Sequence, residues 1–393
     1  MQRRDFVRQG AAALGALALA VHERAVGAPA AAGTHVPRLP PVRASMDRVI
    51  KITVCTRPFR AQGPRLEVEQ IGHKTVVHNY GHGGSGWSLS WGSSSVAAAK
   101  ALSTGSRDCA VIGCGALGLT SAITLQRAGA RVTIYAKDLP PELRSMWATG
   151  VWSPDSRVCL ADQATPAFKS LWAQMARTSF RAYSNYLGLS GAPVDWYDNY
   201  ELTDIPHDRF AAEQAAANTM AFAELQREMT PEIGPVPVDL EPGSHFFPVP
   251  YVRRTSNMMF NLIAYQRLLL SDFQAAGGIV EQREFHTPHD LARLPQKCII
   301  NCTGYGARAL FSDESIVPVR GQLTRLVPQP EVNYGLTYRN VFVVPRRDGI
   351  VLQYFGADEA QGYNDTSTEP DLQEARLAVD TIAQLNEMTP APV

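Results

Sequence analysis

The chain has 393 residues with 37 basic and 37 acidic side chains, and 45% of its residues are hydrophobic. The balanced charge argues against a nucleic-acid partner, which needs a basic surface, and the hydrophobic content excludes disorder as the general state. At about 150 residues per domain, the length predicts two or three domains. No run approaches the ~18 apolar residues that span a bilayer, so a globular protein without a membrane span is expected.

The N-terminal segment is typical of an export signal. Arg3, Arg4 and Phe6 precede an uncharged run over 10–21, and small residues follow at 25–32. A basic start, a short apolar region and small residues together predict a signal peptide, and the paired arginines favour the twin-arginine type. We therefore expect residues 1–32 to be a signal peptide and the protein to be periplasmic or secreted. The alternative is a disordered basic tail beside a short helix.

A glycine-rich segment at 78–92, termed here the glycine block, carries four glycines within six residues. Such a loop exposes backbone N–H donors, and it leads into a small-residue helix expected over 93–101, where an anion or an electron-rich ring can bind. His78 and His82 have the i, i+4 spacing of metal ligands, but the intervening glycines would break the helix that this spacing needs. No metal site is predicted, and His78 is expected to be buried and hydrogen-bonded.

A second glycine motif follows a short apolar strand at 109–112. Gly113, Gly115 and Gly118 form G-x-G-x-x-G, after which a helix is expected over 119–127 and a strand over 131–135. In this context the glycines permit a tight turn, close approach to a pyrophosphate and close helix packing. The motif predicts dinucleotide binding at the helix N-terminus. Asp138, after the second strand, is expected either to bind the ribose hydroxyls or to be a turn residue.

The later elements also indicate an α/β fold. A helix is expected from near Asn257 to Gln274, and strands at 279–282 and 298–302, the latter ending in a glycine turn. Residues 341–345 and 349–354 are expected to pair as a hairpin. The six cysteines show no metal-site spacing, and buried free thiols are favoured over disulfides, although an exported protein permits pairing. These cysteines are Cys55, Cys109, Cys114, Cys159, Cys298 and Cys302.

The glycine block resembles the signature of the D-amino-acid oxidase family. Residues 76–81 fit it, as do Gly83, Gly84, Gly86 and Gly92, while Ser94 replaces its closing alanine. The resemblance extends over most of residues 48–388. Its further matches are Thr56–Pro58, Arg65–Glu67, Ala148, Gly150, Trp152, Pro154, Asn301–Gly304, Arg320–Gln322 and Pro345.

The resemblance implies a Rossmann-like FAD-binding domain and a substrate domain with a mostly antiparallel sheet. The first is expected at 66–155 and 245–312, and the second at 44–65, 156–244 and 313–388. In the family the dinucleotide motif comes first and the glycine block last, whereas here their order is reversed. The chain therefore resembles a circular permutation, with 103–108 as the linker joining the usual ends. Its junction would lie between a helix ending near Glu387 and a strand beginning near Val49.

The resemblance also implies the site. Arg57 would hold the substrate carboxylate, the Gly84 carbonyl would meet the amino group, and Tyr338 would close over the carboxylate. Phe342 stands where the family has a second tyrosine, and Tyr354 is a candidate to replace its hydroxyl. The residues expected to bind FAD are Gly83, Gly86, Trp87, Ser88, Gly113, Gly115, Gly118, Asp138, Arg144, Ser145, Thr149, Gly150, Val151 and Thr303.

The implied activity is the oxidative deamination of a D-amino acid, with FAD as cofactor and O2 reduced to hydrogen peroxide. Two alternatives stay open: a flavin dehydrogenase that passes electrons from an amine or amino acid to a quinone or carrier, and a flavin-binding protein without turnover. The side-chain specificity is left open, with polar or aromatic candidates for the pocket that are equally compatible with structural roles. These are Asp155, Arg157, Trp196, Tyr197, Tyr200 and His245.

Overall fold

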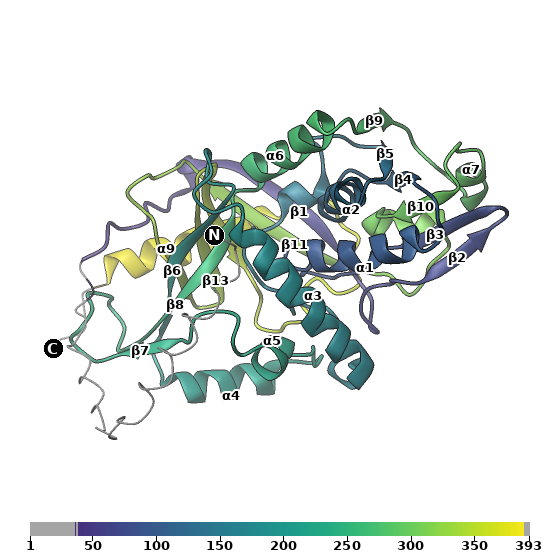
Figure 1. Cartoon of the computed structure of the whole chain (residues 1–393). Coiled ribbons are helices and arrows are strands. Elements are labelled where there is room, and N and C mark those ends of the chain that lie inside the picture. The colour runs from purple at the N-terminus through teal and green to yellow at the C-terminus, as the bar shows by residue number, and fades with distance from the viewer. Residues whose placement is uncertain (1–35, 37, 389–393) are drawn as a thin grey trace, which may run out of the picture. The chain divides into compact units, whose positions relative to one another are not determined.

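The computed structural model describes residues 36 and 38–388. One of its two sheets has six strands in the order β2-β3-β10-β4-β5-β9, and strands β3, β10, β4, β5 and β9 run parallel (Figure 1). The bounds of these strands are β2 Val68–Ile71, β3 Lys74–His78, β4 Asp108–Ile112, β5 Arg131–Ala136, β9 Ile279–Gln282 and β10 Cys298–Asn301. The glycine-block strand β3 and the dinucleotide-motif strand β4 therefore lie on either side of β10.

The other sheet has eight strands in the order β1-β11-β14-β13-β12-β6-β8-β7, and only its β12–β6 pair is parallel. The bounds are β1 Val49–Phe59, β6 Val194–Thr203, β7 Val238–Leu240, β8 Tyr251–Phe260, β11 Val317–Leu326, β12 Gly335–Tyr338, β13 Val341–Arg346 and β14 Gly349–Tyr354. This confirms the predicted fold class, a nucleotide-binding parallel sheet combined with a mostly antiparallel one. The exact domain boundaries given above stay predictions.

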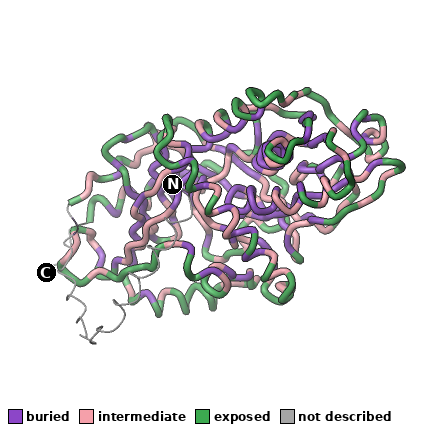
Figure 2. The backbone as a smooth tube through the Cα atoms, viewed as in Figure 1, coloured by how far each residue is buried: buried purple, intermediate pink, exposed green. Residues whose placement is uncertain are grey.

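Helices cover the faces of both sheets. Those of five residues or more are α1 Ser90–Leu102, α2 Ala116–Arg127, α3 Pro166–Ser184, α4 His207–Ala217, α5 Leu225–Met229, α6 Leu262–Ala275, α7 Pro288–Ala292 and α9 Leu372–Glu387. The shorter ones are α8 Ala307–Leu310 and the 3-10 turns Met46–Arg48, Arg144–Trp147, Ala161–Gln163 and Gly304–Gly306. Buried residues gather along the strands, and exposed residues run along the outer helices (Figure 2).

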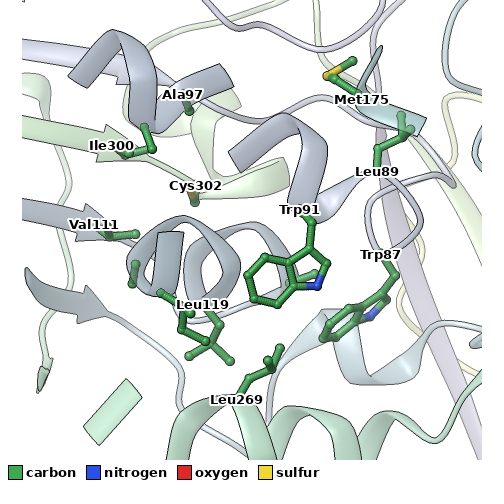
Figure 3. Packing of buried hydrophobic residues seen from close by; sticks show 14 of the residues in the cluster. Trp87, Leu89, Trp91, Ala97, Val111, Leu119, Met175, Leu269, Ile300 and Cys302 are labelled. Atoms are coloured by element: carbon green, nitrogen blue, oxygen red, sulfur yellow. The ribbon is translucent and has the colours of Figure 1, made fainter. Parts of the chain in front are cut away.

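The largest core cluster joins α1 and α2 to one face of the parallel sheet. Val111 and Ile300 point from the strands toward Ala97 and Leu119 of these helices, and Trp91 packs alongside them (Figure 3). The opposite face of the same sheet carries a separate cluster with Val76, Ile299 and Leu291. Burial on both faces explains why β4 and β10 are continuous apolar runs in the sequence.

Most predicted elements are confirmed, including the 341–354 hairpin, the strand beginning at Val49 and the helix ending at Glu387. One prediction was wrong: Asn257 lies within strand β8, and the helix begins only at Leu262. Residues 257–260 pair with 194–197 of β6, so sheet hydrogen bonding overrides the helical pattern there.

The remaining expectations concern linkages and targeting. All six cysteines are buried, and none forms a disulfide in the structure. Over residues 36 and 38–388, no helix is long and apolar enough to cross a membrane, and no cluster of three metal-ligating side chains is found. The predicted signal peptide at 1–32 lies outside the described residues.

Candidate active site

The dinucleotide motif forms a tight backbone cradle between β4 and α2. Gly113 has a φ of +105°, and a Cβ there would lie 2.6 Å from the Cys302 carbonyl oxygen. A Cβ on Gly118 would lie 2.0 Å from the Gly113 carbonyl oxygen, so only glycine lets the first turn of α2 sit against the strand. Gly115 caps α2 without a side-chain hydrogen bond, which leaves the helix N-terminus open to an anion.

A buried hydroxyl faces this cradle. The Ser145 Oγ atom is buried and has no hydrogen-bond partner among the described residues, and it lies 3.2 Å from the position of a Cβ on Gly115. Leaving a buried hydroxyl unpaired costs about 1–3 kcal/mol, and a phosphate oxygen at the helix N-terminus would satisfy it. The cradle and this hydroxyl therefore fit the pyrophosphate of a dinucleotide such as FAD.

A larger cavity lies next to the cradle. It has a volume of about 460 Å³, and Asp138, Arg144 and Trp147 line one side of it while residues of β1 line the other. Two predicted cofactor residues are thus brought to one cavity. The neighbouring Lys137 does not line this cavity, and its ammonium binds the Glu284 carboxylate at 2.6 Å.

The segment at 149–153 lies against the second sheet. Arg346 donates to the Ala148 carbonyl at 2.8 Å, Thr149 donates to Gln353 of β14, and Val151 forms a bridge to Met259. A Cβ on Gly150, whose φ is +81°, would lie 2.7 Å from the Phe260 carbonyl oxygen. The structure therefore holds the predicted flavin residues Thr149, Gly150 and Val151 against strands β8, β13 and β14 of the second sheet.

The glycine block wraps over this segment. The amide of Gly84 donates to the Ser156 carbonyl at 2.9 Å, and the amide of Gly83 donates to the Pro58 carbonyl at 2.9 Å. Ser88 accepts from the Ser153 amide at 2.8 Å. The loop is therefore tied both to β1, which carries Arg57, and to the 149–157 segment.

The other predicted flavin contacts lie nearby, but their side chains have protein partners. Trp87 donates from its indole to the Ser145 carbonyl at 2.7 Å, and Thr303 donates its hydroxyl to Asn301 at 2.8 Å. Gly86 lies beside Leu117 of α2. The Trp87 side chain thus braces the Ser145 segment, while its backbone carbonyl accepts from the Ser90 amide at 3.0 Å and from the Tyr183 hydroxyl.

A buried polar network fixes the base of the glycine block. His82 bonds Ser93 at 2.8 Å, and Ser93 donates to Asn79 at 2.6 Å. Ser94, which replaces the family alanine, bonds Thr120 and Ser121 of α2 at 2.8 and 2.9 Å. The substitution thereby joins α1 to α2 through hydroxyl groups.

His78 is buried and hydrogen-bonded, as predicted. Its Nε2 lies 2.9 Å from a Glu69 carboxylate oxygen, and its Nδ1 lies 3.1 Å from the Asn301 amide nitrogen. Burial lowers the pKa of His78. A neutral ring that donates from Nε2 and accepts at Nδ1 satisfies both partners, so His78 is structural.

Arg57 reaches a small polar cavity of about 60 Å³ at the opening between β11 and β14. Its guanidinium donates to the Arg320 carbonyl at 3.0 Å and lies flat on Gly321, where a Cβ would be 2.4 Å from a terminal nitrogen. Within the described part of the chain, no carboxylate lies within 4.0 Å of this guanidinium. The charge of Arg57 is therefore available to an anionic ligand.

Tyr338 is not brought to this cavity. Its hydroxyl lies 3.7 Å from the Met388 sulfur, and the side chain is buried. Tyr354 does line the cavity, and Phe342 stacks on Phe355, another lining residue, at a centroid distance of 5.8 Å. A role for Tyr338 over the substrate stays a prediction, whereas Tyr354 offers a hydroxyl next to Arg57.

Sequence reasoning missed the polar residues that surround Arg57. Gln353 and Gln361 line the cavity from β14 and the loop after it, and Glu374 reaches it from α9. Arg320 lines it too, but it is paired with Glu374 at 3.1 Å and lies 3.9 Å from Asp365. For Gln353 the signal in the sequence is a polar side chain within an otherwise apolar strand.

The chain belongs to the family of FAD-dependent oxidoreductases, because the family model described as "DAO: FAD dependent oxidoreductase" matches residues 108–391. FAD is the cofactor of this family, in agreement with the cradle at Gly113–Gly118. The match begins at the first strand of the dinucleotide motif, so the glycine block lies outside the matched range.

Individual relatives carry more specific names. The chain is 28% identical over 287 residues to a D-amino-acid oxidase of Streptomyces coelicolor, covering 70% of this chain and 76% of the relative. It is 29% identical over 284 residues to a D-amino-acid oxidase of Rubrobacter xylanophilus, covering 68% and 74%. Among solved structures, glycine oxidase from Geobacillus kaustophilus shares the fold, with a TM-score of 0.50, 13% identity and coverage of 72% and 80%.

Proposed function

We propose that the protein catalyses the oxidative deamination of a D-amino acid, with O2 as the electron acceptor. The observation that carries the proposal concerns the Arg57 guanidinium. It has no carboxylate within 4.0 Å among the described residues, and it lies on the strand that binds the glycine block. Since a guanidinium fork matches a carboxylate bidentately, an amino acid would complete the site. The names of the two curated relatives support the same substrate class.

The proposed mechanism depends on positioning. Arg57 holds the α-carboxylate, and the Gly84 carbonyl accepts a hydrogen bond from the amino group, so that two points fix the α-carbon. FAD, when bound, supplies the acceptor for the hydride that leaves this carbon. Because no strong base is needed, orientation provides most of the rate. The imino acid departs and hydrolyses in water, and O2 takes the two electrons to become hydrogen peroxide.

The test is Arg57→Ala in the flavin-loaded protein. Loss of a charged hydrogen bond, about 1.5–3 kcal/mol, should raise KM for D-amino acids by about 10- to 100-fold while the flavin spectrum stays unchanged. Arg57→Lys should recover part of the loss. An unchanged KM would remove Arg57 from the site. Peroxide formed in equal amount to the imino acid under air supports the oxidase, whereas turnover that requires an added quinone would overturn O2 as the acceptor.

We also propose that the chain is circularly permuted relative to its family. The order of the two glycine motifs supports this, and so does the proximity of the ends to be rejoined, since Asn386 donates to the Val42 carbonyl at 2.6 Å. A chain that starts at Ser106, runs to Met388 and continues through a short Gly-Ser linker to 42–105 should fold and bind FAD like the natural one. Failure of this variant to bind FAD would contradict the proposal.

We further propose that residues 1–32 direct export by the twin-arginine route, on the basis of Arg3 and Arg4. Fused to a folded reporter, this segment should deliver it to the periplasm. Replacing both arginines with lysine should retain the reporter in the cytoplasm. Equal export by both fusions would exclude the twin-arginine route.

A further inference from the structure

A second arginine lines the cavity beside Arg57. Arg157 belongs to the same cavity wall, and the positive charge of Arg57 is close enough to contribute, after burial, to lowering the pKa of Arg157 to about 10. The cavity wall therefore carries two guanidinium groups besides that of Arg320, which is paired with Glu374 at 3.1 Å and lies 3.9 Å from Asp365. One α-carboxylate would neutralise only one of these two.

The contacts of Arg157 leave its terminal nitrogens available. Its Nε donates to the Glu359 carbonyl at 3.0 Å, and its guanidinium lies 5.7 Å from the Phe222 ring centroid. The charges of Glu359 and Asp358 raise its pKa, but over residues 36 and 38–388 no carboxylate lies within 4.0 Å of it. Because a buried charge is costly unless it is paired, a half-buried arginine without a close ion pair favours the binding of an anion.

The position of Arg157 is fixed by a strained turn of the backbone. The φ of Arg157 is +48°, a left-handed conformation that is strained for a non-glycine residue. A Cβ on Gly83 would lie 1.9 Å from the Arg157 carbonyl oxygen, so the strained turn is packed against the loop next to Gly84. The surrounding structure thus holds Arg157 beside the residues proposed to orient the substrate.

We propose that Arg157 binds the side-chain carboxylate of the substrate, so that the substrates are acidic D-amino acids such as D-aspartate or D-glutamate. This inference rests on the proposed function, since it assigns Arg57 to the α-carboxylate and Arg157 to the second one. The cavity of about 60 Å³ has room for such a group, because an ordered water needs about 10–15 Å³. Gln353, Gln361 and Tyr354 add hydrogen-bonding groups around it.

The experiment compares amino acids that differ by one charge. Anaerobic flavin reduction and kcat/KM are measured with D-aspartate and D-asparagine, and with D-glutamate and D-glutamine. Because a charged hydrogen bond contributes this much to binding, kcat/KM for the acids should exceed that for the matching amides by about 10- to 100-fold. Arg157→Gln, which keeps an unbranched side chain at the strained position, should abolish that preference. Arg209→Gln, an exposed arginine paired with Glu213 on α4, is the matched control and should keep the preference.

A binding measurement separates the anion site from turnover. By calorimetry, succinate should bind wild-type protein at least about tenfold more tightly than succinamate, and Arg157→Gln should remove the difference. Equal reduction by acids and amides, or an unchanged preference in Arg157→Gln, would overturn this inference and leave the proposed function intact. Equal binding of succinate and succinamate would also overturn it. Reduction by no D-amino acid would refute the proposed function and the substrate assignment with it.

Discussion

Replacement of Gly118 by alanine tests whether the cofactor cradle depends on direct backbone contact between α2 and β4. The added methyl group would lie 2.0 Å from the Gly113 carbonyl oxygen and 2.7 Å from its carbon. Both are backbone atoms, so no side chain can rotate away and α2 must shift. Overpacking of this kind costs about 1–3 kcal/mol. The shift also displaces the amides of the helix N-terminus, and FAD affinity should fall together with stability.

The assay is equilibrium urea unfolding of the apoprotein combined with FAD titration by fluorescence. Gly306→Ala is the matched control, because its Cβ would meet only Thr303 at 3.7 Å, an ordinary contact distance. We expect a lower unfolding midpoint and weaker FAD binding for Gly118→Ala alone. If both variants unfold and bind FAD like the wild type, the cradle does not depend on this contact and the reasoning is refuted.

Two further predictions concern buried polar groups. Ser145→Ala should weaken FAD binding by about 10- to 100-fold, the contribution of a charged hydrogen bond. It should not destabilise the apoprotein, because the hydroxyl has no partner among the described residues; a less stable apoprotein would contradict this. Burial, and then the charge of Arg60, lowers the pKa of His82 to about 3, whereas an unfolded histidine has a pKa of about 6.5. The unfolded state therefore binds the extra proton between these values, so stability is complete above about pH 6.5 and falls by up to about 1.4 kcal/mol per pH unit toward pH 3. His82→Gln should lessen the loss of unfolding free energy between pH 7 and 5, and an equal loss in both proteins would contradict the assignment.

The cofactor half of the site could be predicted from the sequence because its chemistry is local. Gly113, Gly115 and Gly118 fall within six consecutive positions between a strand and a helix, and their function follows from backbone geometry alone. The same holds for Gly83 and Gly84, whose positions are restricted by close backbone neighbours. Such requirements act between residues close in sequence, so the spacing of the glycines is enough to predict them.

The substrate half depends on contacts between distant segments. Arg57 meets Arg320 and Gly321 more than 260 residues away, because β1 pairs with β11. Arg157 reaches the same cavity from a turn that packs against Gly83, and its side chain is held by the Glu359 carbonyl. Its sequence neighbours give no sign that it lies beside Arg57 rather than in solvent.

The wrong assignment of Asn257 has the same origin. Asn257 lies in a strand because β6 supplies its hydrogen bonds, which the local sequence does not reveal. The sequence by itself determined the fold class, the cofactor and the glycine contacts, since these follow from local backbone geometry. Only the tertiary structure decided which charged side chains share one cavity and lack partners, because burial and ion pairing are properties of segments brought together by folding.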